Sequence, residues 1–456
     1  MKYSESLDYI LSLVDYERMN KSVGSLARYD LEQIREILAS MGNPHLGIPT
    51  AHITGTKGKG STASMMSSIL VSGKQNPGLF TSPHLHTFRE RIQVAGSLIS
   101  EAEFAYLVST IAPIQKKATL PDRRVTLFEF LTAMAFQHFR AKSTKANVLE
   151  VGLGGRLDAT NIVDPTVCGI TSIGIDHVEV LGHTIEEISW EKSGIIKEGV
   201  PVISSPQKDP AMKVIRQMAD SKHSPLTIVG PDIFWKNHTE SLEGHKFDMI
   251  TKNNRYRIEM PLLGSHQVEN ACVAVGMIES MTENGLAVQS SDIEAGLKNV
   301  QWPCRMELIR QEPNLLLDGA HTAHSAKRLA ESMANLFPSG RFVLVVGLQM
   351  NKDLGGLVKE LSHLNPTIVI TTKSRHPKAM PPGIIATEFR SLGFEVIETE
   401  TVADALSVAD NKSDEHITVI GTGSLFVASE MRELIMNIPQ ETYPAFTGYF
   451  EGNMKN

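Results

Sequence analysis

A glycine-rich segment at residues 54–62, Thr-Gly-Thr-Lys-Gly-Lys-Gly-Ser-Thr, contains the residue types that bind a nucleoside triphosphate. Glycines let the backbone turn tightly and expose N–H groups that hold phosphate oxygens. Lys59 can place a positive charge near the terminal phosphates, and the hydroxyl of Ser61 or Thr62 can bind Mg²⁺. Because Gly60 lies between Lys59 and Ser61, the spelling differs from the common G-x-x-x-x-G-K-S/T pattern. We still expect a phosphate-binding loop here.

The flanking residues supply the strand and the helix that such a loop requires. Residues 51–53 form a short run typical of a strand. After the loop, five residues share one face of a helix that Gly73 ends: Thr62, Met65, Met66, Ile69 and Leu70. The N–H groups at the start of a helix favour an anion, so this order of elements supports phosphate binding.

Four more polar clusters follow predicted strands. They are Ser82-Pro83-His84, Glu150 with the glycine-rich residues 152–158, Asp176-His177, and Asp318 with His321. Ligands of parallel α/β sheets bind at the carboxyl ends of strands, so we expect these clusters to meet there. Hydroxyl, carboxylate and imidazole groups suit Mg²⁺ beside phosphates. Taken singly, such residues are more often turn, cap or hydrogen-bonding residues, and only their joint placement indicates a site.

Strand and helix signals alternate along the chain, which predicts parallel sheets with helices on both faces. The first series contains strands at 78–81, 147–151 and 167–173 and helices at 127–141 and 185–197. The second contains strands at 314–317, 341–347, 367–371 and 416–420 and a helix from about residue 323.

The two series predict two domains joined near residues 300–303. The fold class is α/β: an N-terminal P-loop ATPase domain with a mostly parallel sheet (1–301), followed by a C-terminal Rossmann-like α/β domain (302–456). Between the series, residues 207–260 are more polar and irregular, apart from a strand at 256–260.

Composition narrows the class of protein. The 456 residues carry a net charge of −7 and no long block of Lys or Arg, which argues against a nucleic-acid partner. The longest apolar run, 342–348, is too short to span a bilayer, and no secretory signal is evident at the N-terminus. Cys168, Cys272 and Cys304 have no metal-ligand spacing and indicate reduced thiols. We expect a cytoplasmic monomer that acts on small molecules.

Six segments together resemble the folylpolyglutamate synthases and dihydrofolate synthases of the Mur ligase superfamily. These segments are 55–61, 81–85, 89–92, 149–161, 175–177 and 317–321, and the most specific is Leu-Glu-Val-Gly-Leu-Gly-Gly-Arg-Leu-Asp-Ala-Thr-Asn at 149–161. The resemblance implies an ATP- and Mg²⁺-dependent ligase that joins L-glutamate to a pterin-linked carboxylate through an acyl phosphate. Residues 1–301 would then be the ATP-binding domain and residues 302–456 the glutamate-ligase domain.

The resemblance also implies roles for single residues. The phosphate loop would comprise Gly58, Lys59, Gly60 and Ser61. Two Mg²⁺ sites are implied, with the ligands Ser82, Glu150 and His177. Further ATP contacts would come from Asn270, Arg305 and Asp318. The catalytic residues would be Lys59, His321 and Lys192. Lys192 matches a lysine that is carbamylated in the family, and a carbamate, unlike an ammonium, has lone pairs for a metal. A free lysine is the alternative.

Different motifs of this chain match different branches of the family. Lys57 and Thr322 resemble the eukaryotic folylpolyglutamate synthases, whereas residues 156–161 resemble the bacterial bifunctional enzymes. In the latter, the dihydropteroate pocket corresponds to Thr126, Leu127, Phe128, Glu129, Leu157, Asp158 and Ala159. Phe128 suits a flat pterin ring, and Asp158 can accept its N–H groups.

Two other functions stay open at this point. A muramyl-peptide ligase would share the phosphate loop and the metal ligands, but it does not account for the 149–161 spelling. A P-loop switch or motor protein is the second, although Asn351-Lys352-Asp353-Leu354 fails the guanine-selective Asn-Lys-x-Asp pattern. Residues 421–424 could form a second phosphate site, but a plain helix N-terminus explains them better.

Overall fold

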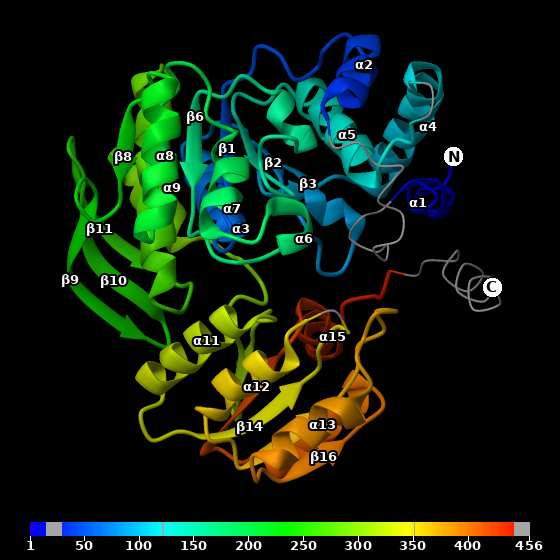
Figure 1. The fold of residues 1–456 in the computed structure, drawn as a ribbon, viewed down its shortest axis with the longest axis vertical. Coiled ribbons are helices and arrows are strands. Elements are labelled where there is room, and N and C mark those ends of the chain that lie inside the picture. Colours follow the sequence, from blue (N-terminus) through cyan, green and yellow to red (C-terminus); the bar gives the residue numbers. More distant parts are fainter. Residues whose placement is uncertain (15–29, 121–122, 351, 442–456) are drawn as a thin grey trace.

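The computed structural model describes residues 1–14, 30–120, 123–350 and 352–441. Asn351 of the guanine-motif comparison and the last 15 residues of the predicted second domain, 442–456, lie outside them. Figure 1 shows a larger lobe above a smaller one. The larger lobe contains an eight-stranded sheet in the order β4-β3-β2-β5-β1-β6-β7-β8. Its strands are β1 (Thr50–Thr54), β2 (Gly78–Phe80), β3 (Ile92–Val94), β4 (Ser97–Leu98), β5 (Asn147–Glu150), β6 (Val167–Ile170), β7 (Val202–Ser204) and β8 (Leu226–Ile228).

Helices cover both faces of this sheet, which explains why its central strands are buried throughout. The helices of the lobe are α1 (Tyr3–Leu11), α2 (Glu32–Ser40), α3 (Lys59–Ser72), α4 (Glu101–Ala118), α5 (Leu127–Ala141), α6 (Val178–Leu181), α7 (Ile185–Ser193), α8 (Asp209–Ser221), α9 (His266–Glu283) and α10 (Ser290–Lys298). On β5, Val148 packs into the core formed with α3 and α9, whereas its neighbour Leu149 packs into the core formed with α5. The alternation of side chains along a strand sends them to opposite faces.

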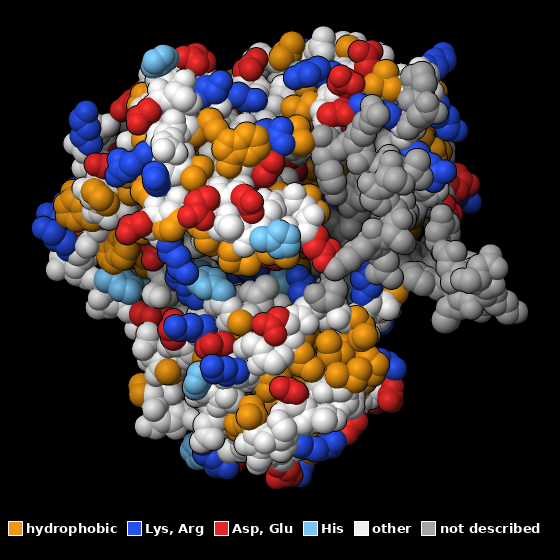
Figure 2. All heavy atoms as spheres, in the orientation of Figure 1, with side chains coloured by type: hydrophobic (Ala, Val, Ile, Leu, Met, Phe, Trp, Pro, Cys, Tyr) orange, Lys and Arg blue, Asp and Glu red, His pale blue; other side chains and the backbone are white. Residues whose placement is uncertain are grey.

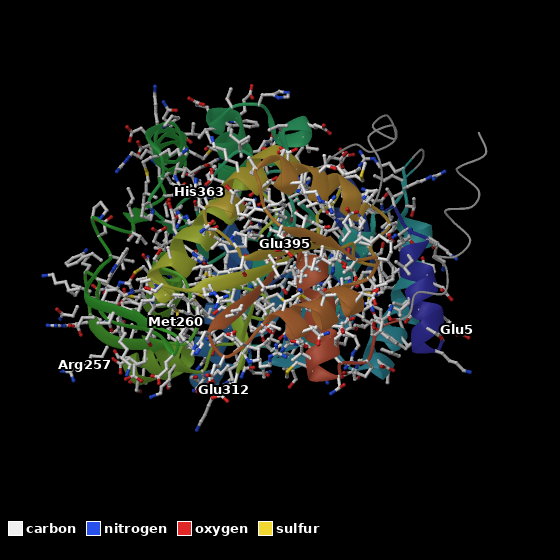
Figure 3. The ribbon with its side chains drawn as sticks, turned by 90° about the horizontal axis from the view of Figure 1, so that it is seen from below. Glu5, Arg257, Met260, Glu312, His363 and Glu395 are labelled. Carbon is white, nitrogen blue, oxygen red and sulfur yellow. The ribbon has the colours of Figure 1, made fainter. Side chains whose placement is uncertain are left out.

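The region 207–260 is more regular than its polar sequence predicted. It contains α8 and the three-stranded antiparallel sheet β9 (Phe234–Ser241), β10 (Gly244–Ile250) and β11 (Arg255–Met260). Only the last strand was predicted. In β11, Tyr256, Ile258 and Met260 are buried while the residues between them are exposed, so one face of this strand is apolar and the other is polar. Figure 3 places this sheet, marked by Arg257 and Met260, on the side of the molecule opposite Glu5 of α1.

The smaller lobe contains a six-stranded sheet in the order β12-β13-β17-β14-β15-β16. Its strands are β12 (Glu307–Gln311), β13 (Asn314–Leu317), β14 (Arg341–Val346), β15 (Ile368–Thr371), β16 (Val396–Glu398) and β17 (Ile417–Thr422). Its helices are α11 (Ala323–Leu336), α12 (Leu354–Ser362), α13 (Pro382–Ser391), α14 (Val402–Lys412) and α15 (Leu425–Met436). Only β12 pairs antiparallel in this sheet. The predicted α/β class, with a mostly parallel sheet in each part, is confirmed.

One loop of the larger lobe, residues 82–91, joins it to the smaller lobe. Leu85 packs against the core of the smaller lobe. The His86 ring lies between two side chains of α15, with Nδ1 3.2 Å from Glu433 Oε1 and Nε2 3.2 Å from Arg432 Nη1. Because this loop also carries Ser82, the two lobes are joined beside the predicted site.

Candidate active site

The predicted phosphate loop connects β1 to α3, and glycine geometry fixes its shape. Gly58 is the N-cap of α3 and has φ +95°, a conformation that residues with a side chain rarely adopt. A Cβ on Gly58 would also overlap Asn270 Oδ1. The loop backbone is held because Thr56 N–H and Lys57 N–H donate to Ser172 O at 2.9 and 3.2 Å. The α3 N-terminus therefore sits in a rigid turn that fits a phosphate group.

Two lysine amines meet at the start of this loop. Lys59 Nζ donates to Gly55 O at 3.1 Å, and Lys192 Nζ donates to the same oxygen at 2.9 Å. Lys192 is 5% exposed, and burial together with the nearby charge of Lys59 lowers its pKa well below the usual value. Burial therefore favours the neutral, nucleophilic form of this amine more than in a solvent-exposed lysine.

Glu150 and Ser82 lie together because β5 and β2 are parallel neighbours whose carboxyl ends meet. Ser82 N–H donates to Glu150 Oε2 at 3.0 Å. Burial raises the pKa of the Glu150 carboxyl group, while the charges of Lys59 and Arg305 act in the opposite direction. A buried acidic group beside a serine, next to a phosphate loop, suits Mg²⁺.

His177 is less closely integrated into this cluster. It has φ +51° and follows Asp176, and its side chain is 54% exposed. Within the described part of the chain, no group of three or more His, Cys, Asp or Glu side chains is arranged to hold a metal ion. The role of His177 as a ligand stays a prediction.

The residues predicted to contact ATP come from both lobes. Asn270 lies on α9 beside Gly58, and its Nδ2 donates to Gln267 Oε1 at 2.9 Å. In the smaller lobe, the Asp318 carboxylate accepts the N–H groups of Met306 at 3.0 Å and Ala320 at 2.8 Å. Burial raises the pKa of Asp318, and the charge of Arg305 acts in the opposite direction.

His321 reaches the phosphate loop from the smaller lobe. Its Nδ1 lies 2.8 Å from Gly319 O, and its Nε2 lies 3.3 Å from Lys57 Nζ. Burial, together with the charge of Lys57, lowers the pKa of His321 to about 3, so the ring is neutral. Figure 2 shows Lys, Arg and His side chains gathered along the boundary between the lobes on this face.

The segments predicted to bind the pterin lie beside the glycine-rich 152–158 turn. A Cβ on Gly152 would lie 2.7 Å from Phe128 Cζ, so this ring covers the turn. Thr126 and Glu129 form a capping box at the start of α5: Thr126 N–H donates to Glu129 Oε2 at 2.8 Å and Glu129 N–H to Thr126 Oγ1 at 3.1 Å. Leu127 is buried in the core of this lobe. Of these residues, Phe128 is the one that remains suited to contact a flat ligand.

The Asp158 carboxylate accepts hydrogen bonds from neighbouring residues of its own loop. Its carboxylate accepts Leu153 N–H at 2.9 Å, Thr160 N–H at 3.0 Å and the Thr160 hydroxyl at 2.5 Å. The side chain is 7% exposed, and burial raises its pKa. These bonds shape the segment that carries Leu157 and Ala159. The contact of Asp158 with a pterin stays a prediction, with fewer acceptor positions left for it.

Two residues near the site were missed by sequence reasoning. Trp302 packs on the phosphate loop, because a Cβ on Gly60 would lie 2.7 Å from its Cζ2. The sequence marked this tryptophan only as part of the junction between the domains. Lys57 was used in the sequence comparison with the family's branches, but no contact was predicted for it. Neither residue has a local pattern that reveals a long-range contact.

The fold and the site define a two-lobed α/β enzyme with a phosphate loop suited to a nucleoside triphosphate. Family models match the chain in both: Mur ligase middle domain over residues 53–278 and Mur ligase, glutamate ligase domain over residues 304–425. Among the described helices, none is long and apolar enough to cross a membrane.

Relatives narrow the class further. The chain is 32% identical over 409 residues to the dihydrofolate synthase/folylpolyglutamate synthase of Bacillus subtilis, covering 88% of this chain and 94% of that protein. The folylpolyglutamate synthase structure from Thermotoga maritima is 34% identical with a TM-score of 0.83, covering 96% of this chain and 98% of that one. The Mycobacterium tuberculosis folylpolyglutamate synthase complexed with ADP is 28% identical with a TM-score of 0.87, covering 96% and 100%.

The chain therefore belongs to the dihydrofolate synthase/folylpolyglutamate synthase family of Mur ligases, and it is an ATP-dependent ligase. The predicted resemblance is confirmed. These relatives favour it over both a muramyl-peptide ligase and a P-loop switch or motor protein.

Proposed function

We propose that this ligase uses ATP to join the amine of L-glutamate to the carboxyl group of reduced folates, and also of dihydropteroate. The name of the Bacillus subtilis relative contains both activities. The observation that carries the proposal is the phosphate loop. Gly58 of this loop packs directly against the Asn270 side chain, and Lys59 and Glu150 lie at the same edge of the sheet. We further propose that the protein is a cytoplasmic monomer. Light scattering tests its oligomeric state.

The reaction has to make a carboxylate electrophilic. The γ-phosphoryl group of ATP moves to a carboxylate oxygen, ADP leaves, and the resulting acyl phosphate is attacked by the glutamate amine, which loses a proton as inorganic phosphate departs. Lys59 and the N–H groups at the start of α3 would neutralise the charge on the phosphates during the first step. Enclosing the acyl phosphate between two lobes would keep water away from it.

Magnesium would be held by the Ser82 hydroxyl and the Glu150 carboxylate, with His177 as a further ligand. When bound, Mg²⁺ would neutralise phosphate charge and orient the phosphoryl group. We propose two such ions.

Lys192 is proposed to carry a carbamate. Its burial and lowered pKa favour the neutral amine that reacts with CO₂, and the product would be an anion beside Lys59. Mass spectrometry of the intact protein should show a CO₂ adduct at Lys192, and a short carboxylic acid should partly restore activity to Lys192→Ala. An unmodified lysine without rescue would leave the free amine, bound to Gly55 O, as the functional form.

The pterin pocket is proposed between Phe128 and the segment Leu157–Ala159, with Asp158 holding that segment in shape. Phe128 also contacts Phe80, with ring centroids 5.6 Å apart, so its ring is supported from behind. A supported aromatic ring loses little entropy when it stacks on a flat ligand.

One assay tests the proposed function. The purified protein is given ATP, Mg²⁺ and radiolabelled L-glutamate with either dihydropteroate or tetrahydrofolate, and ADP release and labelled product are measured. We expect ADP release only when both glutamate and a pterin acceptor are present. Incorporation with tetrahydrofolate alone would leave a folylpolyglutamate synthase without the second activity. ADP release without either acceptor would contradict a ligase reaction.

A further inference from the structure

The Lys57 side chain connects the two lobes. Its ammonium lies 3.3 Å from Asp176 Oδ2 in the larger lobe and 3.3 Å from His321 Nε2 in the smaller lobe. The backbone of Lys57 is fixed by its bond to Ser172 O, and the side chain is 27% exposed. A residue of the phosphate loop therefore holds an ion pair in its own lobe and a hydrogen bond across the boundary.

The hydrogen bonds around His321 define which ring nitrogen can accept. Gly319 O can only accept a hydrogen bond, so Nδ1, 2.8 Å away, carries the proton. In a neutral ring, Nε2 then has a free lone pair, and the Lys57 ammonium is the donor that faces it. Gly319 O thus sets the tautomer, and Lys57 holds the orientation of the ring through Nε2.

The geometry points to Lys57 as a positioning residue that fixes His321 and, with it, the β13–α11 loop of the smaller lobe against the phosphate loop. This inference rests on the proposed function, in which an acyl phosphate formed at the larger lobe must meet a glutamate amine held by the smaller one. The rate of such a step depends steeply on the placement of the reacting groups. Lys57 would act by alignment, without binding substrate.

Three variants separate this role from direct phosphate binding. Lys57→Met keeps the aliphatic stem and removes the donors, whereas Lys57→Arg keeps a charge and donors. Lys213→Met, at an exposed position of α8, is the control for loss of one positive charge. Steady-state kinetics give kcat and KM for glutamate, and calorimetry gives the Kd of a non-hydrolysable ATP analogue.

We expect Lys57→Met to lower kcat/KM for glutamate roughly ten- to hundredfold, as for loss of a charge-assisted hydrogen bond. The Kd of the ATP analogue should change by less than about threefold, and Lys57→Arg should recover part of the loss. In a His321→Ala background, Lys57→Met should add less than about threefold, because the partner is already absent. Lys213→Met should match the wild type.

Three results would overturn the inference. If Lys57→Met loses analogue affinity by the same factor as kcat/KM, Lys57 binds phosphate directly. If the losses of Lys57→Met and His321→Ala multiply in the double variant, the two side chains act independently. Nitrogen NMR of the His321 imidazole with the bound analogue gives a readout independent of turnover: ring-nitrogen shifts equal to the wild type in Lys57→Met would exclude positioning of the ring by Lys57. If the wild type adds no glutamate to any pterin acceptor, the proposed function fails, while affinity and the ring-nitrogen shifts still decide the role of Lys57.

Discussion

Replacing Asp158 with alanine should loosen the 152–161 segment, and the expected loss follows from the hydrogen bonds that its carboxylate accepts. Leu153 N–H, Thr160 N–H and the Thr160 hydroxyl all donate to it, and the side chain is 7% exposed. A buried donor that loses its acceptor costs about 1–3 kcal/mol. Water that enters the space of the lost carboxylate would accept hydrogen bonds from some of these donors. We therefore take the lower value for each donor, which gives a loss of about 3 kcal/mol in the free energy of unfolding for three donors.

The assay compares urea unfolding and steady-state kinetics for the wild type, Asp158→Ala and Asp158→Asn. Asparagine keeps one oxygen for the Thr160 donors but turns an NH₂ group toward Leu153 N–H, so its stability should fall between the other two. Asp164→Ala, an exposed position a few residues further along the chain, is the matched control. Because the segment would serve both acceptors, kcat/KM should fall by similar factors for dihydropteroate and tetrahydrofolate.

A different pattern would refute this reasoning. If Asp158→Ala unfolds at the wild-type urea concentration but loses dihydropteroate activity selectively, the carboxylate binds the pterin and does not organise the loop. That result would restore the direct contact predicted from sequence.

The remaining predictions concern the phosphate loop, the metal and the joint between the lobes. Lys59→Ala should abolish ligation and leave the thermal midpoint unchanged, since the only hydrogen bond given by the Lys59 amine within the described residues goes to Gly55 O; wild-type kcat/KM for ATP would remove Lys59 from the mechanism. Glu150→Gln should raise the Mg²⁺ concentration needed for half-maximal activity, measured by titration, and an unchanged requirement would exclude Glu150 as a ligand. Burial raises the pKa of Glu433, but hydrogen bonds from His86 and Arg375 outweigh it and hold the pKa below its usual range. This carboxylate should therefore add stability above about pH 4.5 that is lost as the pH falls toward its folded pKa. Unfolding at pH 7 and pH 4 should show a smaller acid-induced loss in Glu433→Gln than in the wild type, and equal losses would reject this account.

The sequence by itself determined the class of protein and most of the fold. The phosphate loop at 54–62 and the 149–161 motif are continuous segments, and their chemistry depends on local backbone geometry that residue types and spacing encode. The alternation of strands and helices likewise follows from local hydrophobic periodicity, so β1, β5 and β6 were found near their true positions. The helix predicted at 185–197 ends earlier, at Ser193, where Gly194 follows.

Only the tertiary structure decided which side chains meet across the two lobes. Lys57 and His321 are 264 residues apart, and Trp302 reaches Gly60 from the junction between the sheets. No periodicity reports such contacts, because they depend on how two separately formed sheets pack together. The same holds for Asp158, whose residue type suits either a ligand or a loop. Its carboxylate is shared among backbone donors because the 152–161 segment folds back on itself, and burial then makes those bonds costly to lose.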